Sequence, residues 1–547
     1  MDANKFMEKH IDFDGVDQSV QDVLDLAATG HDQALSRKFS VWSMLAMSFC
    51  ALGTWSAFAQ DLSSGLVTGG PIDIIWGVCL VSFCNLCVGL SLGEMCSSMP
   101  TTLGQAYWTY RLWEGTWGRF CSYMCAWITT FGWWTITASQ VAFMGQFLLQ
   151  MKVIVDQEWA PANTGYVQFL MYVGVTLFFT SVNVVSCRRD WWLPWLNNFV
   201  GGCFVVLFFV FSLALLIAVG VRSDLKFQTA SFTFGKWINL TGWSDGLVFF
   251  LGLLQGAYGL TAYDSTLHMI EELPRPRRNG PLVVNLSIII GGTSGICFMV
   301  ICLFCIQNTD KVINPPTGLP FVELMLQTVG LKATLSLISL FIFNGLGQGT
   351  VMLTAASRLT WGFARDGGLP WSDYLAHIDK TWRAPVRALW AQGVIISLVG
   401  VLYMFSTTVL QAILSVSTIA LTISYTIPIL TLVVVGRDKL PPASIQLGHW
   451  GPLINWVSLI YCSVTTVLFF FPYSPRPTAS DMNYAIAVFA VMIVVAIFFW
   501  VVRGKKTYLQ TNAAILEMEH ALQLESVPEM QIGPDPKNAT TRDKQPE

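Results

Sequence analysis

Two apolar stretches of the chain are interrupted by residues that can present bare backbone and aromatic faces to a small ligand. The first interruption, Leu52-Gly53-Thr54-Trp55, lies in an apolar run that starts at Phe39. Glycine is a poor helix former, and a threonine hydroxyl can hydrogen-bond locally in place of the helical ladder. Irregular backbone at membrane depth is tolerated only where it lines a cavity or is buried in protein. We therefore predict a ligand site here; the alternative is a tolerated glycine in a continuous helix.

The second interruption places two glycines around an aromatic ring. It comprises five consecutive residues, Gln255, Gly256, Ala257, Tyr258 and Gly259. Half-helices that meet at such breaks carry partial positive charge at their N-termini and partial negative charge at their C-termini. A small zwitterion or cation fits between them. The alternative is that the glycines let neighbouring helices pack closely.

Titratable residues follow the second break. Asp264 and His268 are four residues apart and share one helical face, and histidine titrates near neutral pH. The two predict a proton-responsive pair. The alternative, which we prefer, is an inner gate in which Asp264 pairs with Arg358 or Arg365. Glu271-Glu272 are separately predicted to form a solvated cytoplasmic hinge whose charges pair with the Arg-Asp-Gly turn (365–367).

Two further acidic residues fall within the predicted spans, where charges default to functional hypotheses. Asp61 follows the first break and is expected to face an outer, solvated vestibule. Glu94 lies at the inner end of the second span. No Cys/His group has metal-ligand spacing, so no metal or cofactor is predicted.

The elements that must position these residues are membrane helices. Of 547 residues, 53% are apolar and 12% are charged, and the mean hydropathy is +0.54. The net charge of −3 suggests no nucleic-acid partner. Spans of about 20 apolar residues predict an all-α membrane protein with twelve crossings: 40–67, 72–95, 118–148, 165–186, 193–220, 245–269, 281–306, 332–360, 386–405, 408–435, 452–472 and 481–502.

Breaks in the first and sixth spans, five spans apart, predict an inverted repeat with the substrate between the breaks. With both termini on one side, 24 of the 31 Lys and Arg residues fall on that side and seven on the other, so both termini are predicted to be cytoplasmic. The Asn239 sequon then lies outside and predicts glycosylation. The domains are a tail over 1–38, a transporter over 39–505 and a tail over 506–547. The C-terminal tail is predicted to be solvated; the alternative is a short amphipathic helix over 513–524.

Three motifs carry a resemblance to a known family. SLGEMCSSMPTTLGQAYWTY (91–110), YDSTLHMIEELPRPRRNGP (263–281) and SRLTWGFARDGGLP (357–370) resemble signature segments of the amino acid–polyamine–organocation (APC) superfamily. Among its members, the fungal amino acid/choline permeases are the most similar, and GTW (53–55) and LTGWSDG (240–246) look most like the choline carriers.

The resemblance implies the LeuT-like APC fold, a five-plus-five inverted repeat with two added helices and discontinuous helices one and six. It implies alternating access, usually driven by protons. Some bacterial relatives use a lysine on helix five, which is absent here. By position, the resemblance assigns substrate contacts to both interruptions and, more weakly, to three further residues: Trp133, Trp134 and Asn344.

One departure from the family bears on the substrate. Many amino acid permeases of the superfamily have Gly-Ser/Ala-Gly at the helix-one break, where bare N–H groups hold a carboxylate. Trp55 occupies the third position here. Aromatic faces hold quaternary ammonium groups by cation–π contact, so Trp55 and Tyr258 predict two walls of a cage for choline or another amine.

The sequence therefore predicts a plasma-membrane secondary transporter that takes up a small amine-bearing solute, choline-like or an amino acid, together with a proton, in contact with membrane lipid. Alternatives within transport are a GABA or polyamine permease and a carrier of a nitrogenous secondary metabolite. A non-transporting nutrient sensor built on a permease fold is a different class. No catalytic constellation suggests an enzyme.

Overall fold

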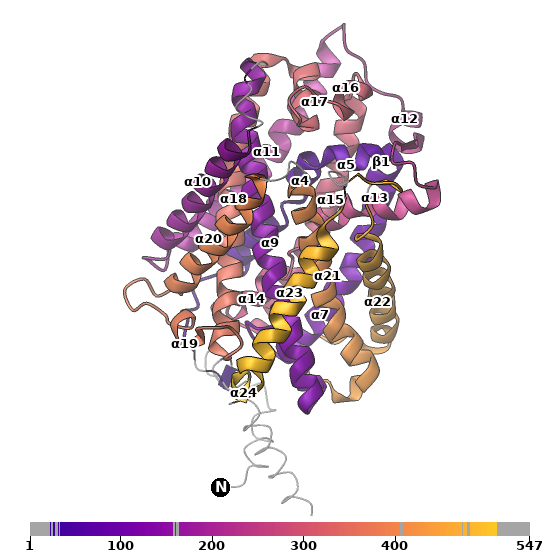
Figure 1. The fold of residues 1–547 in the computed structure, drawn as a ribbon. Helices are drawn as coiled ribbons and strands as arrows, with labels where there is room; N and C mark the ends of the chain where they lie inside the picture. Colours follow the sequence, from indigo (N-terminus) through magenta and orange to yellow (C-terminus); the bar gives the residue numbers. More distant parts are fainter. Residues whose placement is uncertain are drawn as a thin grey trace, which may run out of the picture. The chain divides into compact units, whose positions relative to one another are not determined.

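The computed structural model describes residues 22, 26–27, 31, 33–156, 159, 164–404, 409–472, 474–478 and 482–510. Most of the two predicted tails and the predicted helix over 513–524 lie outside these residues. Within them the chain is almost wholly α-helical (Figure 1). The one sheet of this described part has two short antiparallel strands, β1 (Thr68–Gly69) and β2 (Ile238–Asn239).

Eleven helical segments of the described chain are long and apolar enough to cross a membrane. A shorter interrupted helix at the predicted sixth position falls outside this group, so the count of twelve stays a prediction. The eleven are Val41–Gln60, Gly70–Ser98, Thr116–Val155, Gly165–Ser186, Trp192–Val221, Pro276–Cys305, Leu331–Arg365, Val386–Met404, Ala412–Val435, Gly448–Leu468 and Ala485–Thr507.

The helices follow the chain in this order. They are α3 (Val41–Leu52), α4 (Thr54–Gln60), α5 (Leu62–Val67), α6 (Gly70–Ile72), the π-helix η1 (Asp73–Gly77), α7 (Val78–Ser98), α8 (Gln105–Leu112), α9 (Thr116–Val155), α10 (Gly165–Ser186), α11 (Trp192–Val221), α12 (Ala230–Gly235), α13 (Asp245–Gly259), α14 (Ser265–His268), η3 (Ile270–Glu272), α15 (Pro276–Cys305), α16 (Thr309–Ile313), α17 (Pro320–Val329), α18 (Leu331–Arg365), α19 (Ser372–Leu375), α20 (Val386–Gly400), η4 (Val401–Met404), α21 (Val409–Val435), η5 (Arg437–Lys439), η6 (Gly448–Trp450), α22 (Gly451–Leu468), α23 (Ala485–Phe499), the π-helix η7 (Trp500–Gly504) and α24 (Lys505–Thr507).

The first span is broken at the predicted glycine. α3 ends at Leu52, and Gly53 adopts φ 57° and ψ 25° in the left-handed region. α4 then starts at Thr54, with the Ala57 N–H donating to the Gly53 carbonyl at 2.8 Å. A left-handed residue costs an L-amino acid roughly 1–2 kcal/mol, so glycine is the residue suited to this break.

The second break exists but lies further along the chain than predicted. Gln255–Gly259 are the last residues of α13, and the irregular segment covers the next five residues, through Asp264, with Ala262 at φ 79°. The two glycines serve helix packing instead. A Cβ on Gly259 would lie 2.4 Å from the Phe58 ring, and one on Gly256 would lie 3.3 Å from Val78. The packing alternative was therefore correct for these glycines.

The interrupted first span lies inside the bundle. In the most apolar 18-residue stretch of this span, 78% of the residues are buried. In the corresponding stretch of the last span, Ala485–Thr507, the share is 22%. α9 contacts both α18 and α21, elements far apart in the sequence, and α7 packs against α15 (Figure 1). The broken helix α3–α4 contacts α11, α15 and α18. This arrangement surrounds the irregular backbone with protein, which is the condition for its stability at membrane depth.

Candidate functional site

A small enclosed hollow of about 10 Å³ lies beside the break at Gly53. Side chains and backbone from five helices meet there, and the residues lining the hollow are Ala51, Leu52, Gly53, Ser56, Ala57, Gln60, Ile136, Gln140, Tyr258, Gln348 and Met352. A space of this size holds about one water molecule. The hollow must therefore enlarge before it can admit a substrate.

Amide side chains supply most of the polar groups of this hollow. Gln348 Oε1 lies 3.4 Å from Ser56 Oγ, and its Nε2 donor has no hydrogen-bond partner among the described residues. Gln60 Oε1 is likewise a buried acceptor without a partner in the described chain. The Gln140 Nε2 donates to the Gly345 carbonyl at 3.0 Å. Buried polar groups are normally satisfied, so the unused donor and acceptor mark positions where a polar ligand can bind.

Two helix C-termini reach the hollow. Leu52 ends α3, and Tyr258 lies one residue before the end of α13. Both ends carry the partial negative charge of a helix C-terminus, although at α13 the Ala257 and Tyr258 carbonyls accept hydrogen bonds from Leu260 and Thr261. The Tyr258 hydroxyl lies 2.8 Å from Ser139 Oγ, which fixes the ring. None of the lining residues carries a formal charge, and the N-terminus of α4, which carries partial positive charge, also lies at the hollow. The arrangement therefore suits a small zwitterion or a small cation.

The cage predicted from Trp55 is wrong. Trp55 does not line the hollow; it is fully buried in a cluster of phenylalanines. Its ring stacks on Phe204 at 5.0 Å and meets Phe298 edge-on at 5.0 Å, with three more phenylalanines within 6.3 Å. An indole in so apolar a setting contributes packing. Tyr258 remains the aromatic wall of the hollow.

Other predicted contacts also lie away from the hollow. Leu52, Gly53 and Tyr258 line it, whereas Gln255 donates from Nε2 to the Phe58 carbonyl at 3.1 Å. Thr54 faces α15, since a Cβ on Gly291 would meet its Oγ1. Trp134 also lies outside the lining, and its Nε1 donates to Thr360 Oγ1 at 3.1 Å. The other predicted residues outside the lining are Gly256, Ala257, Gly259, Trp133 and the buried Asn344.

Asp264 is the centre of a buried hydrogen-bond cluster. Its Oδ2 accepts from Gln105 Nε2 at 2.9 Å and Trp133 Nε1 at 3.2 Å, and lies 3.0 Å from His268 Nε2. Its Oδ1 accepts from the Tyr425 hydroxyl at 2.8 Å. The predicted Asp264–His268 contact is therefore present. The preferred alternative, an ion pair of Asp264 with Arg358 or Arg365, is wrong, because both arginines pair elsewhere.

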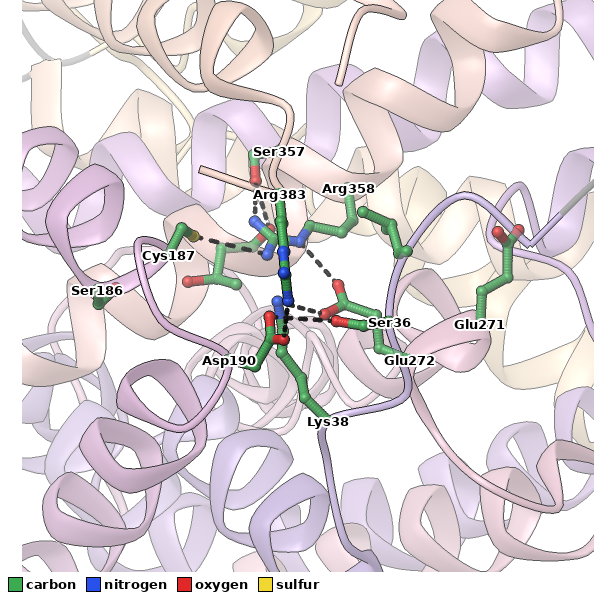
Figure 2. Close-up of polar contacts among 12 residues, drawn as sticks. Ser36, Lys38, Ser186, Cys187, Asp190, Glu271, Glu272, Ser357, Arg358 and Arg383 are labelled. Atoms are coloured by element: carbon green, nitrogen blue, oxygen red, sulfur yellow. Dashed lines mark hydrogen bonds and ion pairs between the residues drawn. The ribbon is translucent and has the colours of Figure 1, made fainter. Parts of the chain in front are cut away.

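A second group of buried polar contacts joins the last turns of α18 to Glu272 and Lys38 (Figure 2). Arg358 Nε donates to Glu272 Oε1 at 2.9 Å, and Lys38 Nζ lies 3.0 Å from Glu272 Oε2. Arg365 binds both oxygens of Glu271 at 3.0 Å. The two glutamates are 5% and 0% exposed, so the prediction that the hinge is solvated is wrong, whereas the predicted pairing with the Arg-Asp-Gly turn is present between Glu271 and Arg365.

Burial and ion pairing act in opposite directions on these glutamates. Burial by itself raises the pKa of a carboxyl group. The guanidinium of Arg365 outweighs burial at Glu271, and Lys38 with Arg358 outweighs it at Glu272, so both pKa values lie below the ordinary value. The ion pairs therefore stay charged at neutral pH and tie the segment before α3 to α18.

Three remaining predicted residues have structural partners. Glu94 accepts from Arg437 Nη2 at 2.6 and 2.7 Å and from the Leu447 N–H at 2.8 Å. Asp61 is 4% exposed and accepts from Ser64 Oγ at 2.7 Å, so it does not face a solvated vestibule as expected. Asn239 Nδ2 donates to the Trp243 carbonyl at 2.9 Å, and its glycosylation stays a prediction.

Sequence reasoning missed most of the polar lining. Gln60, Gln140 and Gln348 are amides within otherwise apolar spans, and that signal could have identified them. Gln60 also lies seven residues after Gly53, two helical turns along the same face. Ser56 gives no such signal, since serine is common in membrane helices.

The comparisons with known proteins agree with one another. The family described as amino acid permease matches residues 39–507. A choline transporter of Saccharomyces cerevisiae is 29% identical over 476 residues, covering 87% of this chain and 83% of the relative. Amino-acid permease BAT1 of Arabidopsis thaliana is 27% identical over 528 residues, covering 92% and 99%. The GABA-specific permease of S. cerevisiae is 26% identical over 499 residues, covering 90% and 86%.

Proposed function

Because this chain belongs to the amino acid permease family, and is thus a multi-pass membrane transporter of amino-acid-like solutes rather than an enzyme, we propose that it takes up a small amine-bearing solute by alternating access. The binding site is the hollow at the helix-one break. The observation that carries this proposal is the pair of unused amide groups on Gln60 and Gln348, facing the break at Gly53.

The substrate carries a positive amine, with choline-like solutes first and GABA or neutral amino acids second. Support comes from the two helix C-termini, the free Gln60 carbonyl and the Tyr258 ring, all of which stabilise positive charge. The relatives' names divide between choline, GABA and amino acids. A carboxylate-bearing amine can use the Gln348 amide donor as well, so the choice depends on measured selectivity.

Coupling to a proton is proposed at Asp264 and His268. The groups that face Asp264 are Gln105 from α8, Trp133 from α9, His268 from α14 and Tyr425 from α21. Among the described residues no Lys or Arg pairs with it. A carboxyl group beside an imidazole can hold or release a proton as the helices around it separate.

Orientation and location complete the proposal: both termini in the cytoplasm and the protein in the plasma membrane. The excess of Lys and Arg on the terminal side supports this orientation. The Lys38–Glu272–Arg358 and Glu271–Arg365 layer then closes the cytoplasmic side of the bundle. Opening to the cytoplasm requires these ion pairs to separate.

The test is uptake of labelled choline, GABA and a panel of amino acids in a host that lacks its own permeases, at about pH 5.5 and 7.5, on either side of the ordinary pKa of histidine. The proposal expects saturable uptake of at least one amine solute, greater at the lower pH. Gln348→Leu should raise the KM for that solute, and Asn344→Leu, one turn away and outside the hollow, should not. No uptake of any solute by surface-expressed protein would support a sensor instead.

A further inference from the structure

A large hollow that is separate from the one at the helix-one break lies on the outside of the bundle. It is a groove of about 720 Å³ between the end of α10 and the start of α11. Its walls include three tryptophans, Trp191, Trp192 and Trp195, and two valines and a leucine. The volume is within the range of about 300–1,000 Å³ typical of ligand sites.

The groove faces the membrane rather than the interior. Trp191 and Trp195 are 56% and 57% exposed, and Val185 is 49% exposed. Only 33% of the most apolar window of α11 is buried. Tryptophans are typical of the zone where the hydrocarbon core meets the headgroups. The groove therefore spans the boundary between acyl chains and headgroups.

One cation lies against a wall of this groove. Arg188 and Arg189 are both exposed in the turn between α10 and α11. Arg189 lies 5.7 Å over the ring of Trp192, a wall of the groove, whereas Arg188 lies 5.9 Å over the ring of Trp382, which is outside it. The neighbouring Asp190 is occupied by Arg383 at 2.8 Å and by Ser36 (Figure 2). Within the described residues no carboxylate forms an ion pair with either arginine of the turn.

We propose that the groove binds an anionic phospholipid, with an acyl chain against the tryptophans and the headgroup phosphate against Arg189. Arginine is suited to phosphate because its planar fork donates two parallel hydrogen bonds. Ser36 contacts Asp190 in the same turn, so the site lies at the end of the bundle that carries the N-terminal segment. In the proposed orientation this is the cytoplasmic leaflet, where anionic lipids are concentrated. The binding itself does not depend on the transported solute.

The test is native mass spectrometry of the purified full chain, titrated with phosphatidylserine and with phosphatidylcholine of the same acyl chains. We expect preferential retention of phosphatidylserine. Arg189→Gln should weaken its binding about fivefold, the effect of one cation at the membrane surface. Arg278→Gln, which removes another exposed arginine away from the groove, should leave binding unchanged.

A third variant tests the apolar half of the site. Ser181 lines the groove and is exposed, so Ser181→Trp should occupy part of the groove and weaken binding of phosphatidylserine without changing the charge. Equal retention of both lipids, an equal effect of Arg189→Gln and Arg278→Gln, or a bound sterol that displaces the phospholipid would each overturn the proposal. If Ser181→Trp does not fold, the arginine comparison still decides.

Discussion

Substitution of Gly53 tests whether the break in the first span is needed for transport. The structure puts this residue at φ 57°, where a Cβ costs roughly 1–2 kcal/mol. That Cβ would also lie 3.1 Å from Gln348 Oε1 and 3.4 Å from Ser56 Oγ. Relative to conformations in which residue 53 is helical, Gly53→Ala should depopulate the broken conformation about 5- to 30-fold. Uptake per molecule at the cell surface should fall by a similar factor.

Two matched glycines separate the causes. Gly115 has φ 96° and ψ −173°, a conformation that is essentially restricted to glycine, and a Cβ added there would meet no atom within 4 Å. Gly115→Ala therefore carries a backbone cost at least as large as that at Gly53, without contact with the hollow. Gly174 is helical, and a Cβ added there would also meet no atom within 4 Å, so Gly174→Ala carries neither a left-handed backbone cost nor a contact with the hollow. The assay is initial-rate uptake of the labelled amine solute, normalised to surface biotinylation. Wild-type kinetics for Gly53→Ala, or an equal loss for Gly115→Ala, would refute the reasoning.

Trp55→Ala removes a ring packed against five phenylalanines, which costs about 3–5 kcal/mol of stability. The amount of protein at the cell surface should fall, while the protein that reaches the surface should keep the wild-type KM. A raised KM would place Trp55 at the substrate site after all. Glu272→Gln breaks the pairs with Lys38 and Arg358. The lowered pKa of Glu272 means that its stabilisation is complete above its unfolded value of about 4.3 and is lost as the pH falls through the folded value. Between about pH 5 and 8 this variant should thus lose thermal stability by an amount independent of pH, and a loss confined to one end of that window would contradict the pairing. Asp264→Asn should flatten the pH dependence of uptake, and an unchanged profile would exclude Asp264 from proton coupling.

The fold class and the first break could be predicted because a helix that crosses the membrane needs a long run of apolar residues, and such runs are visible in the sequence. Long apolar runs can only be spans, and Gly53 inside one of them marks a conformation that other residues resist. The family resemblance stated from three motifs is confirmed by the match over residues 39–507. The second break was misplaced because glycines at Gly256 and Gly259 act through packing, and the left-handed residue is Ala262, which carries no sequence signal for that conformation.

The direction in which a side chain faces was the least predictable feature. Trp55 and Gly53 are two residues apart, and on a helix such residues face different sides, so the indole points to the phenylalanine cluster while the break faces the hollow. The partners of Asp264 are equally non-local: Gln105 and Tyr425 are 159 and 161 residues away. Only the tertiary arrangement of α8, α14 and α21 brings them together.

Counterflow in proteoliposomes tests the account most directly. Purified protein is reconstituted with unlabelled choline or another amine solute inside and a trace of the labelled solute outside, with no ion gradient. We predict transient accumulation of label for the wild-type chain and for Asn344→Leu, and strongly reduced accumulation for Gln348→Leu at the same solute concentration. Absence of counterflow with every amine tested, or full activity of Gln348→Leu, would contradict a transport site at the helix-one break.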